Sequence, residues 1–221
     1  PLAVQVRLLA ALTPGERFDY HCKLMSLPGL FQTRVDSIPW PGPYLRAPDP
    51  ARIARWAAHV GDHGFRIGIV WKGNPSRTID GGRSVPLACF APLAKLPGVR
   101  LISLQKRYGL EQLQALPPGM RVETLPEDFD EGADAFADSA ALVQHLDLVV
   151  SSDTSMGHLA GALGRPVFLA LKFVPEWRWF LGREDTPWYP GHRLFRQPVL
   201  DDWDSAFEAM AAALAPRLAA G

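Results

Sequence analysis

The sequence predicts an α/β protein with a Rossmann-like, doubly wound parallel sheet. From residue 65 onward, short apolar runs rich in β-branched residues alternate with segments of helical periodicity. Such alternation is typical of parallel sheets that are covered by helices on both faces. The 221 residues are 48% hydrophobic and 21% charged, which is the composition of a globular protein and not of a disordered one.

The first half of this region opens with a helix. Asp49 is expected to cap it and Pro50 to occupy its first turn, with Ile53, Trp56 and Val60 on one face. The short apolar run at 65–71 is typical of a buried strand. The elements that follow are a helix at 85–96 behind a proline first turn, a strand at 99–105, a helix at 109–116 that stops before Pro117, and a strand at 120–125.

The second half repeats the pattern. A helix at 139–146, capped by Asp138 or Ser139, precedes a strand at 146–152 whose β-branched residues favour a parallel sheet. The last elements are a helix at 154–163 closed by Gly164, strands at 166–171 and 192–196, and a helix at 202–218 with Trp203, Phe207, Met210 and Leu214 on its inner face.

Residues 1–48 differ from the rest because prolines interrupt any long helix or strand. We interpret them as the remnant of a preceding domain plus a linker, and residues 49–221 as the Rossmann-like domain. The start of the chain has no signal-peptide layout, and no run of about 18 apolar residues predicts a membrane span.

Composition excludes several function classes. Lys plus Arg and Asp plus Glu are both 23, so the formal net charge is zero, which argues against a nucleic-acid-binding protein. The two cysteines, Cys22 and Cys89, form no disulfide framework, and no Cys/His spacing indicates zinc. A cytoplasmic protein with no metal and no bound cofactor is therefore expected.

The strongest candidate site is the junction at 151–166, where a strand ends and a helix begins. Asp153 is expected to cap that helix, and the free amides of Thr154, Ser155 and Met156 favour an anion such as phosphate. Gly157 and Gly161 let the helix approach the sheet. An ordinary capped helix explains the pattern equally well, and His158, taken alone, fits a packed histidine better than a catalyst.

The long polar loop at 71–84 is the second candidate, because long loops at strand ends are often functional. Lys72, Asn74 and Arg83 are its candidate ligand contacts, and Arg83 is the preferred phosphate contact because a guanidinium pairs bidentately with phosphate. The alternative is a solvated surface loop. Neither G-x-G-x-x-G nor G-x-x-x-x-G-K-[ST] occurs, which counts against a dinucleotide fold and a P-loop ATPase.

Three further segments carry weaker signals. Gln105 and Lys106 follow the second strand and are expected beside the first loop, unless they are plain surface residues. Phe136 either lies against a nucleotide base or covers the core. The Trp-rich loop at 173–190 either stacks on a sugar or base or forms a domain interface. No G-x-S-x-G elbow indicates a serine hydrolase, and the acidic residues near 128–131 are better explained as a solvated run than as a glycosidase pair.

Several segments together resemble the C-terminal half of a GT-B glycosyltransferase, and most closely the heptosyltransferase family. In bacteria this version often follows tetratricopeptide repeats, in relatives of O-linked N-acetylglucosamine transferase. The resemblance covers roughly 65–215, and its most specific part is the D-T-x-x-x-H-L-A-x-A-L pattern. The segments are SLQK at 103–106, FADSAALVQHLDLVVSSDTSMGHLAGALGRPVF at 136–168 and PEWRWFLGREDTPWYPGHRLFRQ at 175–197.

The resemblance implies a donor site for a UDP- or ADP-linked sugar. The diphosphate would lie on Asp153, Thr154, Ser155 and Met156, with His158 nearby. Arg83, with Lys72 as a second candidate, would meet the phosphates, and the region of Phe136 and Asp138 would hold the base.

The expected function is therefore the nucleotide-sugar-binding half of an inverting, metal-independent hexosyl- or heptosyltransferase. The expected partners are an acceptor protein or lipopolysaccharide precursor and an N-terminal domain that the chain lacks. No catalytic base is assigned, because only one regular sheet domain is evident. The alternatives are a non-catalytic nucleotide-binding or protein-docking module, and a nucleotide-sugar epimerase, for which no second set of donor residues is found.

Overall fold

The computed structural model describes residues 15–40, 42–46, 49–75, 81–132, 134 and 136–219. The chain divides into two compact units, one ending at Ile38 and the other spanning Pro39–Gly221. In the first unit the described residues form only short helical turns, and none of them is buried. These turns are η1 Leu24–Ser26, α1 Leu27–Leu30 and η2 Val35–Ser37. The core therefore belongs to the second unit.

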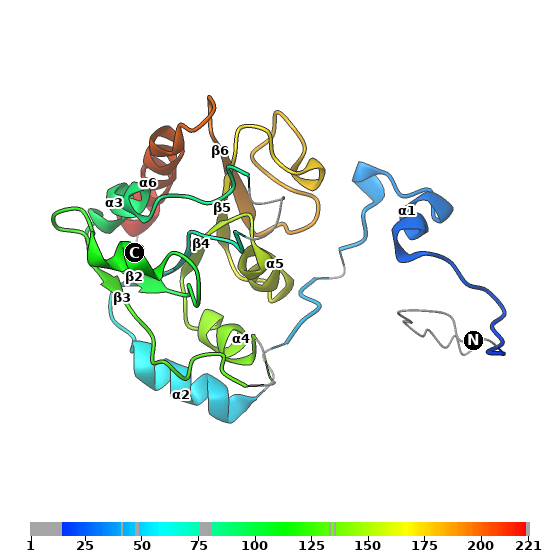
Figure 1. The fold of residues 1–221 in the computed structure, drawn as a ribbon, viewed down its shortest axis with the longest axis horizontal. Coiled ribbons are helices and arrows are strands. Elements are labelled where there is room, and N and C mark those ends of the chain that lie inside the picture. Colours follow the sequence, from blue (N-terminus) through cyan, green and yellow to red (C-terminus); the bar gives the residue numbers. More distant parts are fainter. Residues whose placement is uncertain are drawn as a thin grey trace. The chain divides into compact units, whose positions relative to one another are not determined.

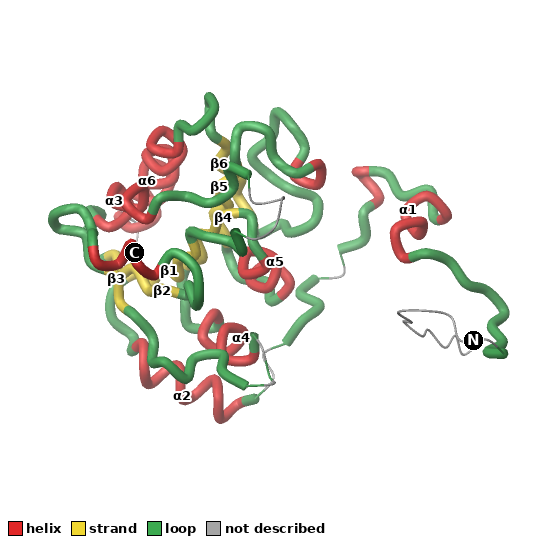
Figure 2. The backbone as a smooth tube through the Cα atoms, in the orientation of Figure 1, coloured by secondary structure: helices red, strands yellow, loops and turns green. Residues whose placement is uncertain are grey.

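The second unit contains a six-stranded parallel sheet with the order β3-β2-β1-β4-β5-β6. This arrangement confirms the predicted fold class (Figures 1 and 2). All six predicted strands are present: β1 Phe65–Val70, β2 Val99–Ser103, β3 Val122–Glu123, β4 Leu148–Ser152, β5 Val167–Leu171 and β6 His192–Arg196.

Helices cover both faces of the sheet (Figure 1). The helices α2 Pro50–Val60, α4 Ala137–Val143 and α5 Ser155–Ala162 lie on one face. The other face carries η4 Leu87–Phe90, α3 Ala91–Ala94 and α6 Trp203–Ala219. Two 3-10 turns, η5 Leu110–Gln114 and η6 Trp177–Trp179, lie in the connections after β2 and β5. None of the helices in the described part of the chain has the length and apolarity needed to cross a bilayer.

Most helix boundaries follow the sequence signals. The carboxylate of Asp49 accepts a hydrogen bond from the Ala51 amide at 2.9 Å, so α2 begins where the cap and proline predict. The helix expected at 139–146 instead begins at Ala137, and neither Asp138 nor Ser139 caps it. Phe136 occupies the N-cap in a left-handed conformation with φ 68°, and the Asp138 carboxylate bonds to α2 instead of capping α4.

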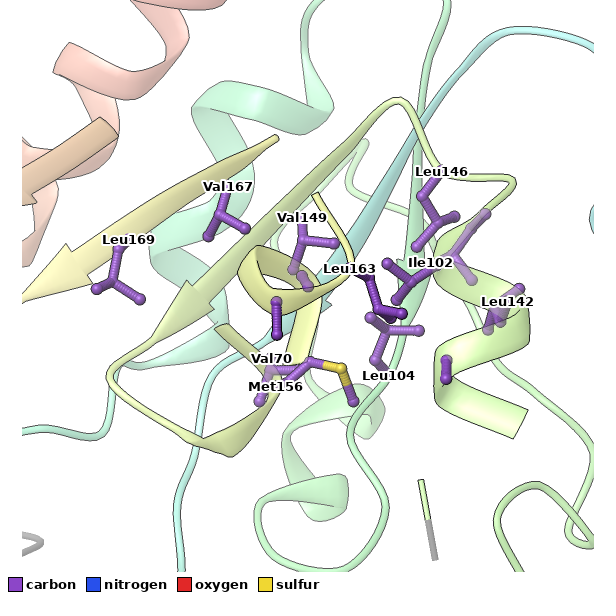
Figure 3. Packing of buried hydrophobic residues seen from close by; sticks show 14 of the residues in the cluster. Val70, Ile102, Leu104, Leu142, Leu146, Val149, Met156, Leu163, Val167 and Leu169 are labelled. Carbon is purple, nitrogen blue, oxygen red and sulfur yellow. The ribbon is translucent and has the colours of Figure 1, made fainter. Parts of the chain in front are cut away.

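The central strands are buried on both sides, which explains their nearly continuous apolar sequence. In β1, Ile67 and Ile69 face one core cluster, whereas Val70 faces the other. Figure 3 shows the second of these clusters, which packs between the sheet and α4 and α5. The middle positions of these strands are therefore apolar on both faces, and the polar residues Arg66, Ser103, Ser151 and Ser152 lie near the strand ends.

The strand order reverses at β1, because later strands are added on the other side of β1 from β2 and β3. The chain runs outward from β1 to β2 and β3, then returns so that β4 pairs with β1 on its other side, with Val70 opposite Ser151. In open α/β sheets, ligands bind beyond the carboxyl ends of the strands at such a reversal. The residues after Val70 and Ser152 are therefore the first place to look for a site.

The Gly68→Ala substitution tests the packing of β1. A Cβ at this position would lie 2.5 Å from Leu146 Cδ1 and 2.7 Å from Leu104 Cδ1, and both leucines are buried. We expect the variant to lose about 1–3 kcal/mol of unfolding free energy in urea denaturation, because the close-packed core must shift. Gly81→Ala is the matched control, since no atom lies within 4 Å of its Cβ position. Equal stability of the two variants would contradict this packing.

Candidate functional site at the β1–β4 reversal

The loop after β1 takes its shape from Gln105. The Gln105 side-chain oxygen accepts hydrogen bonds from the amides of Trp71 (3.1 Å) and Lys72 (3.0 Å). Its nitrogen donates to the Lys72 carbonyl at 2.8 Å. Gln105 thus lies beside the first loop as predicted, but its amide binds backbone there. It orients the loop and has little capacity left for a ligand.

Arg83, ten residues after Gly73 in the chain, lies against the start of the loop that follows β1. Its Nη2 lies only 2.6 Å from where a Cβ of Gly73 would be, so the guanidinium lies on the bare backbone of that glycine. The Val85 amide donates to the Trp71 carbonyl at 2.8 Å and closes the loop behind it. Arg83 therefore stands at the carboxyl end of β1, the position predicted for a phosphate contact.

Two other predicted residues lie in this loop. The Lys72 ammonium is 3.6 Å from the Glu111 carboxylate, and Asn74 is half-buried. Arg77 lies outside the described residues. The structure therefore brings Lys72, Asn74, Arg83 and Gln105 together.

The start of α5 lies next to this loop, because β4 pairs with β1. The N-cap of α5 is Thr154 and not Asp153, and no side chain accepts a hydrogen bond from the first turn. The Thr154 hydroxyl instead lies 3.0 Å from the Ser151 hydroxyl. The exposed Ser155 and the backbone amide of the buried Met156 complete this end. An uncapped N-terminus with hydroxyl groups around it favours an anion.

His158 follows one turn into α5 and has contacts on three sides. Its Nδ1 lies 3.2 Å from the Tyr189 hydroxyl and its Nε2 lies 3.2 Å from Nη1 of Arg178. The Asp153 carboxylate is 3.9 Å from Nε2, and the Trp179 ring stacks on the imidazole at 5.3 Å between centroids. Burial, and to a lesser degree Arg178, lowers the pKa of His158 despite the opposing charges of Asp153 and Glu176.

Close packing of aromatic rings keeps this arrangement in place. Tyr189 stacks on His192 at 4.7 Å, and a Cβ on Gly161 would lie 2.5 Å from the His192 ring and 2.6 Å from the Tyr189 ring. Burial lowers the pKa of His192 to about 3, so that ring is neutral at physiological pH. The absence of a side chain at Gly161 therefore allows both rings to lie against α5.

An open, apolar pocket of about 370 Å³ adjoins the start of α5. Phe136, predicted to lie against a base, forms one wall and is 43% exposed. Tyr44 and Leu45 also line the pocket, and their amides both donate to the Ala162 carbonyl, at 3.0 and 3.1 Å. The full lining comprises Tyr44, Leu45, Phe136, Ser155, His158, Leu159 and Ala162.

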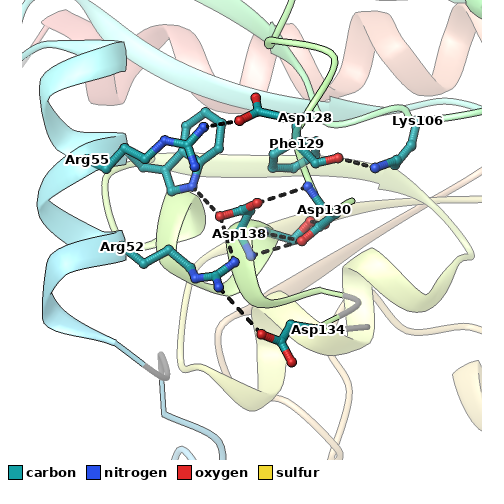
Figure 4. A network of polar contacts seen from close by, with 10 residues as sticks. Arg52, Arg55, Lys106, Asp128, Phe129, Asp130, Asp134 and Asp138 are labelled. Carbon is teal, nitrogen blue, oxygen red and sulfur yellow. Dashed lines mark hydrogen bonds and ion pairs between the residues drawn. The ribbon is translucent and has the colours of Figure 1, made fainter. Parts of the chain in front are cut away.

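Asp138 and Lys106 belong to a separate polar network beside this pocket (Figure 4). The buried Asp138 carboxylate accepts hydrogen bonds from Arg52 (3.0 Å), from the Trp56 indole (2.9 Å) and from the Asp130 amide (3.0 Å). Lys106 donates to the Phe129 carbonyl and pairs with Glu131 at 3.0 Å. Neither side chain lines the pocket. Both instead join the loop that precedes α4 to the body of the domain, and Lys106 does not lie on the loop after β1.

Burial alone would disfavour the ionised form of Asp138. The hydrogen bonds from Trp56, the Asp130 backbone and Arg52 outweigh that cost, so the pKa of Asp138 is below its usual value. Among the described residues, no group of three or more His, Cys, Asp or Glu side chains is arranged to hold a metal ion.

Sequence reasoning missed several residues of this region. Tyr44 and Leu45 lie in a proline-rich segment that was assigned to a linker, and nothing local in the sequence indicates that they bond to α5. Arg178 and Tyr189 lie in the Trp-rich loop. That loop was interpreted either as stacking on a sugar or base or as a domain interface, and neither interpretation includes contacts to His158. The high number of aromatic residues in the loop was the only sequence feature that pointed to it.

Residues 96–171 match the model of glycosyltransferase family 9 (heptosyltransferase). This heptosyltransferase-like segment runs through β2, β4, α5 and β5 and contains Asp153, Thr154 and His158. It covers the start of α5, but not the loop after β1.

Two curated proteins are similar in sequence. Protein FlbA of Caulobacter vibrioides is 32% identical over 203 residues, which cover 90% of this chain and 33% of FlbA. The putative lipopolysaccharide heptosyltransferase 4 of Escherichia coli is 37% identical over 87 residues, which cover 39% of this chain and 20% of that protein.

A solved structure, the E. coli ADP-heptose LPS heptosyltransferase II, superposes with a TM-score of 0.56 at 17% identity. The match covers 83% of this chain and 57% of that chain. This likeness supports the fold. The chain thus spans about a third of FlbA and little more than half of the solved enzyme.

Asp138→Asn tests the polar network. A carboxyl group whose pKa is lowered on folding stabilises the protein above its unfolded pKa of about 4, and that contribution is lost as the pH falls through the folded pKa. We expect the variant to be about 2 kcal/mol less stable at pH 7. The difference should shrink as the pH falls from about 4 toward 2, measured by urea denaturation at each pH.

Asp185→Asn is the control for this experiment. Asp185 pairs with Arg183 on the surface, so its replacement should leave stability unchanged. A pH-independent difference between the wild type and Asp138→Asn would show that the ionised carboxylate is not the stabilising form.

Proposed function

We propose that this chain is the nucleotide-sugar-binding part of a glycosyltransferase. The observation that carries the proposal is the uncapped N-terminus of α5 at the sheet reversal, inside the segment that matches the heptosyltransferase family model. Free amides at that end and Arg83 on the neighbouring loop present donors for a diphosphate. The solved heptosyltransferase with the same fold supports this assignment.

The phosphates would lie on the amides of Ser155 and Met156 and on the hydroxyls of Thr154 and Ser155. Arg83 and Lys72 would approach from the loop after β1. The acceptor hydroxyl oxygen would attack the anomeric carbon opposite the diphosphate, so a new C–O bond forms while the bond to the phosphate oxygen breaks and the configuration inverts. The donors stabilise the charge that develops on the leaving diphosphate, and the arginine and lysine make a metal unnecessary.

The apolar pocket would receive the nucleotide base of a UDP- or ADP-linked sugar. Phe136 and Leu159 offer apolar surface to a planar ring, and the pocket begins at Ser155, where the phosphates would lie. The acceptor would be a protein or a lipopolysaccharide precursor, and its hydroxyl would be deprotonated by a base that we do not assign.

Because the chain spans only part of its relatives, we propose that transfer requires a second domain. This domain would be the N-terminal half of a GT-B enzyme, accompanied by tetratricopeptide repeats in proteins of this type. The exposed side chains of Phe173, Val174, Trp177 and Leu181 on the loop after β5 favour a second candidate function, a docking module without catalytic activity.

Calorimetric titration with UDP, ADP and GDP, and with their sugar conjugates, tests the phosphate site. We expect one nucleotide class to bind, and Arg83→Ala to weaken it about tenfold or more, because a charge-assisted hydrogen bond contributes about 1.5–3 kcal/mol. Thr154→Val should weaken binding less. Arg183→Ala, which removes a surface arginine on the loop after β5, should have no effect. Unchanged affinity in Arg83→Ala would remove Arg83 from the site.

Phe136→Ala separates base recognition from phosphate recognition. The variant should bind the nucleotide several-fold more weakly, because apolar contact with the base is lost, and should bind inorganic pyrophosphate as the wild type does. Phe173→Ala is a matched control, since both rings are 43% exposed but only Phe136 lines the pocket. Equal losses in both variants would contradict a base pocket at Phe136.

A further inference from the structure

We infer that Arg178 is a positioning residue of the donor site. Arg178 holds His158 as a neutral ring whose proton is on Nδ1. This inference rests on the proposed function for its meaning, but the geometry that supports it is independent of any ligand. It assigns a role to a residue of the Trp-rich loop and removes His158 from the candidates for a general base.

The direction of the hydrogen bonds follows from the chemistry of arginine. A guanidinium has five N–H donors and no acceptor, so the 3.2 Å contact with Nη1 of Arg178 requires a lone pair on Nε2 of His158. The proton of the neutral ring must then be on Nδ1, which donates to the Tyr189 oxygen at 3.2 Å. The Tyr189 proton is left to donate to the Tyr44 hydroxyl, also at 3.2 Å.

Arg178 is itself oriented by neighbours on its own loop. Its Nε lies 2.6 Å from the Glu176 carboxylate, and its carbonyl accepts a hydrogen bond from the Trp188 indole at 2.8 Å. The guanidinium therefore points at His158 in one defined orientation. Glu176 also lowers the net charge of the pair, which limits repulsion between the guanidinium and the imidazole.

The charges around His158 oppose each other. Asp153, at 3.9 Å, favours the protonated imidazole, whereas Arg178 and the burial of the ring favour the neutral form. Glu176, which pairs with Arg178, adds a weaker charge that also favours the protonated imidazole. Burial raises the pKa of Tyr189 and lowers the pKa of His192 to about 3, so these two neighbours stay neutral. Burial has the largest effect on His158, and Arg178 occupies the Nε2 lone pair, so the neutral form is favoured.

This protonation state has a consequence for the site. Both ring nitrogens of His158 are used within the protein, so the imidazole presents an apolar wall to the pocket and has no free lone pair with which to accept a proton from an acceptor hydroxyl. Positive charge on this side of α5 comes from Arg178. Near neutral pH, binding of the donor should therefore not depend on a charge on His158.

Nitrogen-15 NMR of the histidine side chains in the whole chain tests the inference without a ligand. At pH 8 the wild type should show His158 with a protonated Nδ1 and an unprotonated Nε2, and the ring should gain its second proton at a lower pH than a free imidazole. In Arg178→Met, which keeps most of the apolar stem, the midpoint of His158 should move to higher pH, because only burial then opposes the charge of Asp153. Tyr189→Phe should keep the Nδ1–H form, since Arg178 still occupies Nε2, and Arg183→Met should match the wild type.

Binding of UDP-glucose and ADP-glucose, whose diphosphates do not titrate in this range, supplies the functional measurement. As the pH is lowered from 8 to 5, Arg178→Met should gain affinity, about threefold or more, as His158 gains charge beside the phosphates, and this gain should occur at a higher pH than any gain in the wild type. A proton on Nε2 in the wild type at pH 8, or an unchanged midpoint in Arg178→Met, would overturn the inference. If NMR shows the expected protonation of His158 but neither sugar nucleotide binds, the result would instead count against the proposed function.

Discussion

The pairing of β1 with β4 is the constraint on which the rest of the domain depends. These strands are far apart in the sequence, yet Val70 lies opposite Ser151 in the centre of the sheet. Their loops must therefore leave the sheet side by side, and this juxtaposes Arg83, lying on Gly73, with the open end of α5. In the proposed function each loop would supply one part of a diphosphate site, because one carries Arg83 and Lys72 and the other carries amides and hydroxyls.

The six strands were predictable because burial on both faces of the central strands leaves a strong signal in the sequence, whereas their order in the sheet was not predicted. The central strands are short, mainly apolar runs, and the helices between the strands have clear start and stop residues such as Asp49 and Gly164. The start of α4 was not predictable in this way. Its local cap signal, Asp138, is used instead by Arg52 and Trp56, and these residues lie more than eighty positions earlier in the chain.

The candidate site was predictable in part, for a related reason. Thr154 and Arg83 lie in the loops that follow strands, where the sequence predicts them. Their binding role stays a prediction. Gln105 and Lys106 were expected beside the loop after β1, but only Gln105 lies there, and the polar groups of both residues bond to loops of the domain itself. Sequence shows that a polar side chain lies at a strand end, but not whether backbone from another loop reaches it first.

The small residues of α5 explain why so many segments meet there. A Cβ at Gly157 would lie 3.0 Å from Leu169 of the sheet, one at Gly161 would collide with Tyr189 and His192, and one at Gly164, just beyond the helix, would collide with Pro43. Each missing side chain admits a different neighbour, so the sheet, the loop after β5 and residues 42–46 all contact one short helix. Those contacts leave the N-terminal end of α5 open, together with the side that lines the apolar pocket from Ser155 to Ala162. The free amides therefore lie at one end of this pocket.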